Sequence, residues 1–152
     1  MRKTLFIVRG IPGSGKSTLA ALLAPKANFA ADDYYTDEAG DYHFDRALSP
    51  YAHADCRQRM IDAMLHEIEH IAIHNTFVES WEAEEYYRLA AYHGYEVHVV
   101  EAQGNFGNVH DVPQDIVMDM MRRWHPYLKP PRDYDTIRDA AAKRVQVFES
   151  DE

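Results

Sequence analysis

Short apolar runs alternate with amphipathic stretches along most of the chain. The apolar runs predict strands at residues 4–9, 28–31, 70–76 and 95–101. The stretches that follow them are rich in helix-forming residues and predict helices at residues 16–24, 50–69, 80–93, 113–124 and 134–147. This alternation is typical of an α/β fold, here a three-layer α/β/α sandwich with a mainly parallel sheet of four or five strands.

The predicted helix at residues 50–69 has the clearest periodicity. Its apolar side chains recur every fourth residue and form a stripe that we expect to be buried, namely Cys56, Met60, Met64 and Ile68. The helix at residues 80–93 has Ser80 at its N-cap position and Gly94 after its last turn. Trp81 and Trp124 are expected in the core.

Three prolines at positions 126, 130 and 131 interrupt the pattern near the C-terminus. We therefore expect one domain over residues 1–127 and a C-terminal extension over residues 128–152, with a helix that packs on the same domain. Because parallel strands place their carboxyl ends on one rim of a sheet, the ligand site is expected at that rim.

Composition narrows the function classes. The 152 residues hold 16 basic and 25 acidic side chains, a net charge of −9, which disfavours binding along an extended nucleic acid duplex but leaves room for a nucleotide or a nucleic-acid end. No apolar run approaches the roughly 20 residues that cross a bilayer. The single cysteine, Cys56, fits a reducing compartment. We expect no targeting segment and no membrane partner, hence a cytoplasmic protein, in a bacterial host cell if phage-encoded.

One motif predicts a ligand directly. Residues 10–17 match the P-loop pattern G-x4-G-K-S, between a predicted strand and a predicted helix. The glycines let backbone N–H groups converge on phosphate oxygens at the positive end of the helix. Lys16 is expected to reach the β- and γ-phosphates of ATP, and the Ser17 hydroxyl to hold Mg²⁺. The predicted cofactor-binding residues are Gly10, Pro12, Gly13, Ser14, Gly15, Lys16, Ser17 and Thr18.

Two acidic residues follow the second predicted strand and should lie on the same rim. Asp32 can accept the proton of a hydroxyl that attacks the γ-phosphate, and Asp33 can hold Mg²⁺ together with Ser17. The alternative is that both only cap the following turn. At the end of the third strand, Asn75 and Thr76 suit either the substrate side of the site or a simple strand-end turn.

Other candidates are open to two interpretations. Arg122 and Arg123 can stabilise the transferred phosphate as catalytic residues, or form a solvated helix face. Tyr35, with Tyr34, Tyr42 and Phe44, can stack on a substrate base or pack the loop. Arg57 and Arg59 are weaker candidates for a substrate phosphate. The histidines are expected to be surface or hydrogen-bonded residues and not zinc ligands.

From Lys3 to Tyr127 the chain resembles a P-loop kinase-like family that includes phage polynucleotide 5′-hydroxyl kinases and ATP-binding domains of the NEDD4-binding-protein-2 type. The P-loop is shared widely, and other segments make the resemblance specific. These are Asp32-Asp33-Tyr34, Tyr42 to Asp45 with Ala52-His53, Asn75-Thr76-Phe77 with Trp81-Glu82, Gly104 to His110, Val112-Pro113 and Met121 to Trp124.

The resemblance implies a P-loop NTPase kinase-like fold with Asp32 as the general base on a hydroxyl. In two places the chain departs from the polynucleotide kinases. Ala31 and Tyr35 stand where those enzymes flank their base with arginines. The stretch from Glu101 to Asn108 is too short for a lid helix, and Gly107 stands where a lid arginine is expected.

Three functions follow from these features. The first is an ATP-dependent kinase for a nucleoside, a nucleotide, a nucleic-acid 5′ end or a small metabolite. The second is a nucleotide-binding regulatory module or slow ATPase without an acceptor, which the missing lid arginine favours. The third is a structural protein with a vestigial P-loop, which would not explain why Lys16 and Ser17 are both intact. The sequence does not indicate an oligomeric state.

Overall fold

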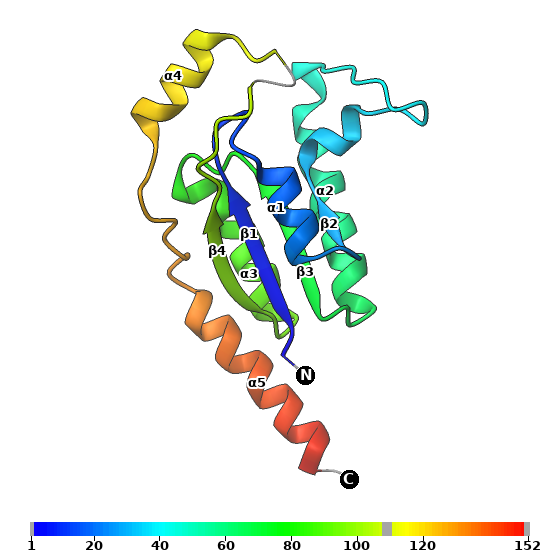
Figure 1. The fold of residues 1–152 in the computed structure, drawn as a ribbon. Coiled ribbons are helices and arrows are strands. Elements are labelled where there is room, and N and C mark those ends of the chain that lie inside the picture. Colours follow the sequence, from blue (N-terminus) through cyan, green and yellow to red (C-terminus); the bar gives the residue numbers. More distant parts are fainter. Residues whose placement is uncertain (1, 108–110, 151–152) are drawn as a thin grey trace.

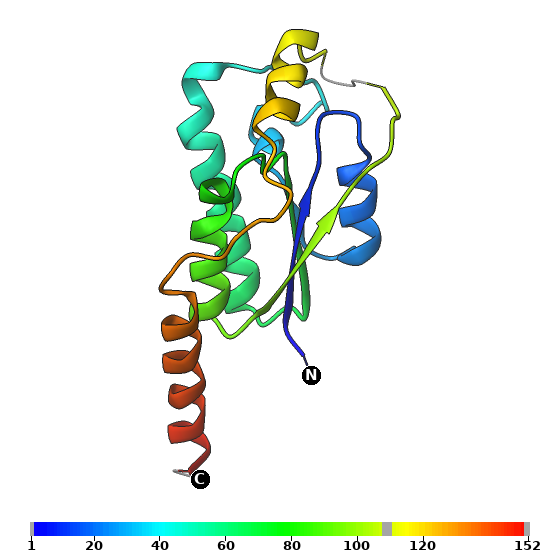
Figure 2. The ribbon, with the colours of Figure 1, turned by 90° about the vertical axis from the view of Figure 1, so that its left-hand side faces the viewer.

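The computed structural model describes residues 2–107 and 111–150 and shows a parallel sheet between two layers of helices (Figure 1). The four strands, in the spatial order β2-β3-β1-β4, are β1 (Thr4–Arg9), β2 (Asn28–Phe29), β3 (His70–Asn75) and β4 (Glu96–Glu101). Helix α1 (Lys16–Leu23) covers one face, and α2 (Ser49–Leu65) and α3 (Glu84–Tyr92) cover the other (Figure 2). The predicted three-layer architecture is therefore confirmed.

All described strand pairs are parallel. β1 pairs with β3 from Thr4 opposite His70 to Arg9 opposite Asn75, and with β4 on its other side. The strands consequently end side by side, and the P-loop, the residues after β2 and the residues after β3 meet at one rim. This is the rim at which α/β folds bind ligands.

The main core lies between the sheet and the α2–α3 layer. Leu5 and Ile7 of β1 and Ile71 and Ile73 of β3 point into it and are fully buried. Opposite them, α2 contributes the predicted stripe, of which Cys56, Met60 and Met64 are buried and Ile68 packs at the edge. A smaller core under α1 contains Val8, Ala20, Ala24 and Ala72. Burial on both faces explains why β1 is almost continuously apolar.

The observed elements differ from the predicted ones mainly at their ends. β2 stops at Phe29, and residues 31–35 form the 3-10 helix η1 (Ala31–Tyr35). α2 ends at Leu65 and not at residue 69, because Glu67 adopts a positive φ of 56° that a helix cannot contain. Two further 3-10 turns, η2 (Arg46–Leu48) and η3 (Ser80–Ala83), precede α2 and α3.

Two helices follow β4 within residues 111–150. Helix α4 (Gln114–Arg123) lies above the sheet rim, and α5 (Tyr134–Ser150) runs along the side of α3 and beyond it (Figure 1). The chain between them is anchored, because Leu128 is buried and its carbonyl accepts a hydrogen bond from the Tyr87 hydroxyl at 2.8 Å. The rings of Tyr87 and Tyr134 pack edge to face. No helix among the described residues is long and apolar enough to cross a membrane.

Candidate phosphate-transfer site

The P-loop joins β1 to α1 in the conformation that its glycines allow. Gly13 and Gly15 have φ values of 82° and 94°, in the left-handed region that side chains with a Cβ disfavour. Gly15 is the residue before α1, so the first N–H groups of that helix open toward the loop. The backbone thus forms the concave, N–H-lined surface that binds phosphate oxygens.

Lys16 is the charged residue of this loop. Its Nζ donates a hydrogen bond to the Ile11 carbonyl at 3.1 Å, which folds the side chain back across the loop. Burial lowers the pKa of Lys16 from 10.5 to about 8, and the nearby Asp32 carboxylate acts in the opposite direction. The lysine therefore lies in surroundings that favour an anionic ligand, because such a ligand stabilises the charged ammonium.

Asp32 and Asp33 open η1 at the same rim, but their carboxylates have different partners. The Tyr42 hydroxyl donates to Asp32 Oδ1 at 3.1 Å. Asp33 accepts the Ala30 N–H at 2.9 Å and lies 3.9 Å from Arg59. Asp33 thus performs the capping role that the sequence left as the alternative, and its part in holding Mg²⁺ stays a prediction.

Asn75 fixes the position of η1 relative to the sheet. Its Oδ1 accepts the Ala31 N–H at 2.9 Å, which ties the residue before Asp32 to the end of β3. The carbonyl of the next residue, Thr76, accepts the Gly10 N–H at 3.3 Å and so holds the start of the P-loop. Both residues act at the predicted place. Their contacts are with the backbone of the site, and a contact with substrate stays a prediction.

Burial bears on two aromatic residues. Tyr35 is only 6% exposed and packs with Ala31, Ala52 and Tyr42, which is the loop-packing alternative, and a contact with substrate stays a prediction. Trp81 is 67% exposed and so lies outside the core, although its indole N–H donates to Glu79. Both residues lie in 3-10 helices that are too short to show a periodicity from which burial can be inferred.

Arg122 and Arg123 end α4 and pair with acidic neighbours. Arg123 binds Glu79 at 2.7 Å and Asp119 at 2.8 Å, and the exposed Arg122 lies 3.3 Å from Asp119. The Arg123–Glu79 pair holds α4 to the loop after β3, whereas the pairs with Asp119 lie within α4. A catalytic role would require Arg122 or Arg123 to leave its carboxylate partner, so that role stays a prediction.

Arg9, the last residue of β1, is a site residue that the sequence did not reveal. It is 2% exposed, and its guanidinium donates to the carbonyls of Phe77, Val78 and His125 at 2.7 to 3.1 Å. It also stacks on the Trp124 ring, 3.9 Å from the centroid. Burial lowers the pKa of Arg9, and the nearby Glu101 opposes this effect. An arginine at the end of an otherwise apolar strand was the available signal.

The segment after β4 runs along the P-loop. The Gly104 N–H donates to the Ser14 carbonyl at 3.0 Å, and the Phe106 N–H donates to the Gly13 carbonyl at 2.8 Å. The expected loop from Gly104 to His110 is seen as far as Gly107, whereas residues 108–110 lie outside the described residues. The expectation that this loop holds neither a lid helix nor a lid arginine is therefore tested only up to Gly107.

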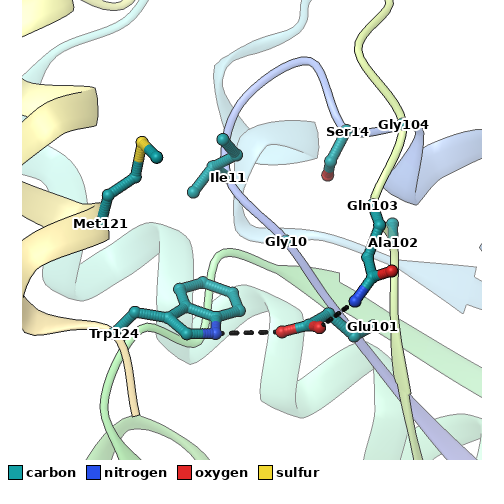
Figure 3. A pocket seen from close by; sticks show the side chains of 9 residues that line it. All are labelled: Gly10, Ile11, Ser14, Glu101, Ala102, Gln103, Gly104, Met121 and Trp124. Carbon is teal, nitrogen blue, oxygen red and sulfur yellow. Dashed lines mark hydrogen bonds between the residues drawn. The ribbon is translucent and has the colours of Figure 1, made fainter. Parts of the chain in front are cut away.

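Between this segment, the P-loop and α4 lies a pocket of about 270 Å³ (Figure 3). Its lining residues come from the end of β1, the P-loop, the end of β4 and α4 with the residue after it, namely Gly10, Ile11, Ser14, Glu101, Ala102, Gln103, Gly104, Met121 and Trp124.

A cluster of possible metal ligands lies away from this rim. Asp37, Asp41 and His43 bring their ligand atoms within 4.8 Å of one another in an exposed turn. His43 Nε2 contacts Asp37 Oδ2 at 3.0 Å, and Asp37 accepts two backbone N–H groups. These bonds account for the cluster as a turn, so we assign no ion to it.

Comparison with known sequences points to one family. The model of the AAA_33 family, described as an AAA domain, matches residues 5–104. Human NEDD4-binding protein 2 is 30% identical over 139 residues, which is 84% of this chain and 8% of that protein. Rat 2′,3′-cyclic-nucleotide 3′-phosphodiesterase is 40% identical over 81 residues, 45% of this chain and 19% of that protein. The chain thus spans a small part of either relative.

Two solved structures share the fold at low identity. A chain of a Pnkp1/Rnl/Hen1 complex aligns with a TM-score of 0.53 and 20% identity, over 84% of this chain and 41% of that chain. A putative kinase from Chloroflexus aurantiacus aligns with a TM-score of 0.52 and 16% identity, over 91% of this chain and 79% of that chain. Taken with the P-loop geometry and the parallel sheet, the family match shows that the chain belongs to the P-loop kinase-like AAA_33 family.

Proposed function

We propose that this protein is a phosphotransferase that moves the γ-phosphate of ATP to a hydroxyl group of a nucleoside, a nucleotide, a nucleic-acid 5′ end or a small metabolite. The observation that carries the proposal is the Asp32 carboxylate beside Lys16 at the rim of the sheet, held by the Tyr42 hydroxyl at 3.1 Å. A P-loop alone needs no such carboxylate, whereas transfer to a hydroxyl needs a proton acceptor.

In this mechanism the P-loop N–H groups and Lys16 hold the phosphates. Asp32 accepts the proton of the acceptor hydroxyl as its oxygen bonds to the γ-phosphorus, and the bond from that phosphorus to the β–γ bridging oxygen breaks to release ADP. The Ser17 hydroxyl is the ligand offered to Mg²⁺, which prefers oxygen donors. When bound, Mg²⁺ would neutralise charge on the phosphates.

The acceptor is proposed to be small or an end of a chain. The net charge of −9 opposes a long polyanion, and the side chains that flank the Asp32–Tyr34 segment, Ala31 and Tyr35, are uncharged. The relatives support a phosphate-ester chemistry of nucleotides, since one is named as a cyclic-nucleotide phosphodiesterase and one solved structure as a putative kinase.

A second candidate is a nucleotide-binding regulatory module or slow ATPase. It is favoured by the pairing of Arg122 and Arg123 with Asp119 and Glu79, which leaves neither guanidinium on the P-loop. Without a further cation beside Lys16 over the γ-phosphate, the transition state loses electrostatic stabilisation.

The two functions separate in one experiment. The protein is incubated with γ-labelled ATP, Mg²⁺ and a panel of hydroxyl acceptors that includes 5′-hydroxyl oligonucleotides. We expect label on at least one acceptor, and loss of that label by about 100-fold or more in Asp32→Asn, in line with the usual weight of a general base. Glu38→Gln removes an exposed carboxylate from the same loop and is the matched control. Free phosphate alone, unchanged in Asp32→Asn, would establish the second candidate.

A further inference from the structure

The pocket between the P-loop and α4 has one aromatic wall. The Trp124 indole lines it from below, and Ile11 and Met121 lie above the indole (Figure 3). Arg9 covers a face of the same indole and does not line the pocket, so the ring is clamped and the rest of it is presented to the pocket. A clamped aromatic ring is a ready platform for stacking by a flat ligand.

Two polar groups complete the lining. The Ser14 side chain is 3% exposed, its hydroxyl oxygen points toward the pocket, and it has no hydrogen-bond partner among the residues that the structure describes. A buried hydroxyl without a partner is costly, which indicates that a ligand or water completes it. Ser14 lies between Gly13 and Gly15, the two P-loop glycines with positive φ, so the loop conformation sets its position.

Glu101 lies on the floor of the pocket, where its carboxylate can accept hydrogen bonds from a ligand. One carboxylate oxygen accepts the Trp124 indole N–H at 2.9 Å, and the other accepts the Gln103 amide at 2.6 Å. A carboxylate offers about four lone-pair sites, so about two remain for a ligand donor. Carboxylates of this kind recognise the exocyclic amino groups of bases.

We propose that this pocket binds a nucleobase that carries an exocyclic amino group, stacked on Trp124 and donating to Glu101. The volume of about 270 Å³ lies just below the range of about 300–1,000 Å³ found for drug-sized ligands, and therefore suits a single base. The inference rests on the proposed function in one respect, namely that the base belongs to the phosphate donor or to the acceptor. Ser14 belongs to both sites, and its hydroxyl would bond a ring nitrogen or a sugar oxygen.

Tryptophan fluorescence gives a direct test. In Trp81→Phe, Trp124 is the single tryptophan, and its emission is followed as adenosine, cytidine, uridine or ribose is added. We expect quenching by adenosine and cytidine at concentrations several-fold lower than for uridine, which lacks the amino group, and none by ribose. Unchanged emission with all four, or equal response to uridine and cytidine, would overturn the proposal.

Two variants on α4 provide a matched comparison. Met121→Ala removes a wall of the pocket, while Met118→Ala shortens a similarly exposed methionine that does not line it. We expect Met121→Ala to weaken adenosine binding by about fivefold or more, the scale of partial loss of a base contact, and Met118→Ala to leave it unchanged. Equal binding in the two variants would contradict the assignment.

Further experiments show whether the bound base belongs to the phosphate donor or to the acceptor, and they test the pocket separately from the proposed function. With saturating Mg²⁺-ATP in the P-loop, an adenosine response that persists assigns the pocket to the acceptor. Quenching by ATP that prevents the adenosine response assigns it to the donor. If bases bind but no acceptor is labelled, the assignment of the pocket stands and the proposed kinase function is rejected. If a nucleoside is labelled, and Met121→Ala transfers phosphate and binds adenosine as the parent protein does, the kinase function stands and the assignment of the pocket is rejected.

Discussion

The ammonium group of Lys16 lies in surroundings that disfavour its charge. Because burial lowers its pKa to about 8 in the folded protein without ligand, Lys16 loses its proton between about pH 7 and 9. We predict that the affinity for Mg²⁺-ATP falls as the pH rises through this range, since a neutral amine does not attract phosphate oxygens. Titration calorimetry at several pH values checks this.

Lys16→Arg is the control for that prediction, because a guanidinium keeps its charge throughout the range. Its ATP affinity should change little between pH 7 and 9, whatever its absolute value. The free protein should respond with the opposite sign. A lysine whose pKa is lower in the folded state binds fewer protons there than when unfolded, so its contribution to stability rises with pH between about 8 and 10.5. A pH-independent affinity in the parent protein would contradict the role of Lys16.

Arg9 is predicted to matter for stability and for the shape of the pocket together. Arg9→Met leaves the carbonyls of Phe77, Val78 and His125 without their donor and frees the Trp124 ring. We expect the free energy of unfolding to fall by about 3 kcal/mol, within the range for buried charged hydrogen bonds. Urea unfolding measures this, and Arg122→Met, on an exposed guanidinium, should change it by less than about 1 kcal/mol.

At the residue scale, the sequence predicted the placement of those residues that belong to a local motif. The P-loop residues and the position of Asp32 follow from strand, glycine loop and strand end. Three contacts could not be inferred, because each joins residues more than 40 positions apart. They are the hydrogen bonds of Arg9 to the Phe77 carbonyl, the hydrogen bond from Ala31 to Asn75 and the stacking of Arg9 on Trp124. Such contacts depend on the register of β1 and β3, which no single segment encodes.

At the scale of elements, Asn75 links η1 to the sheet. Asn75→Ala removes the acceptor of the Ala31 N–H, whereas Asn75→Asp keeps an oxygen at nearly the same place. We predict faster amide hydrogen exchange over residues 31–35 in the alanine variant and about a tenfold lower kcat/KM in any transfer reaction, with the KM for ATP unchanged. The aspartate variant should retain slow exchange, and equal exchange in both variants would show that η1 holds itself in place.

Helices and strands were predicted well in type and less well at their ends. β1 has the predicted bounds because apolar residues fill it from Leu5 to Val8 and polar residues border them. The second strand was predicted too long because Ala30 and Ala31 fit a strand equally well. The bond to Asp33 makes Ala30 the N-cap of η1, and the bond to Asn75 holds Ala31 as its first residue. Tertiary hydrogen bonds thus override local propensity at the site.

At the scale of the whole molecule, the segment after residue 127 takes part in the main core. Leu128 is 1% exposed, and we predict that Leu128→Ala lowers the free energy of unfolding by about 2–5 kcal/mol, as deletions of buried leucines do. Chemical denaturation measures the change, with Leu22→Ala, at an exposed position of α1, as the control. An effect as small as that of the control would support residues 128–152 as an independent extension.

The order of the strands leaves one side of β4 without a partner among the described strands. An unpaired edge offers a row of N–H and C=O groups to any other strand, and proteins guard such edges with charged side chains. The exposed Glu96, with His98 at 3.4 Å, places this polar guard near the start of the edge. This charged pair is therefore expected to disfavour edge-to-edge pairing of β4 with the sheet of a second copy of the chain.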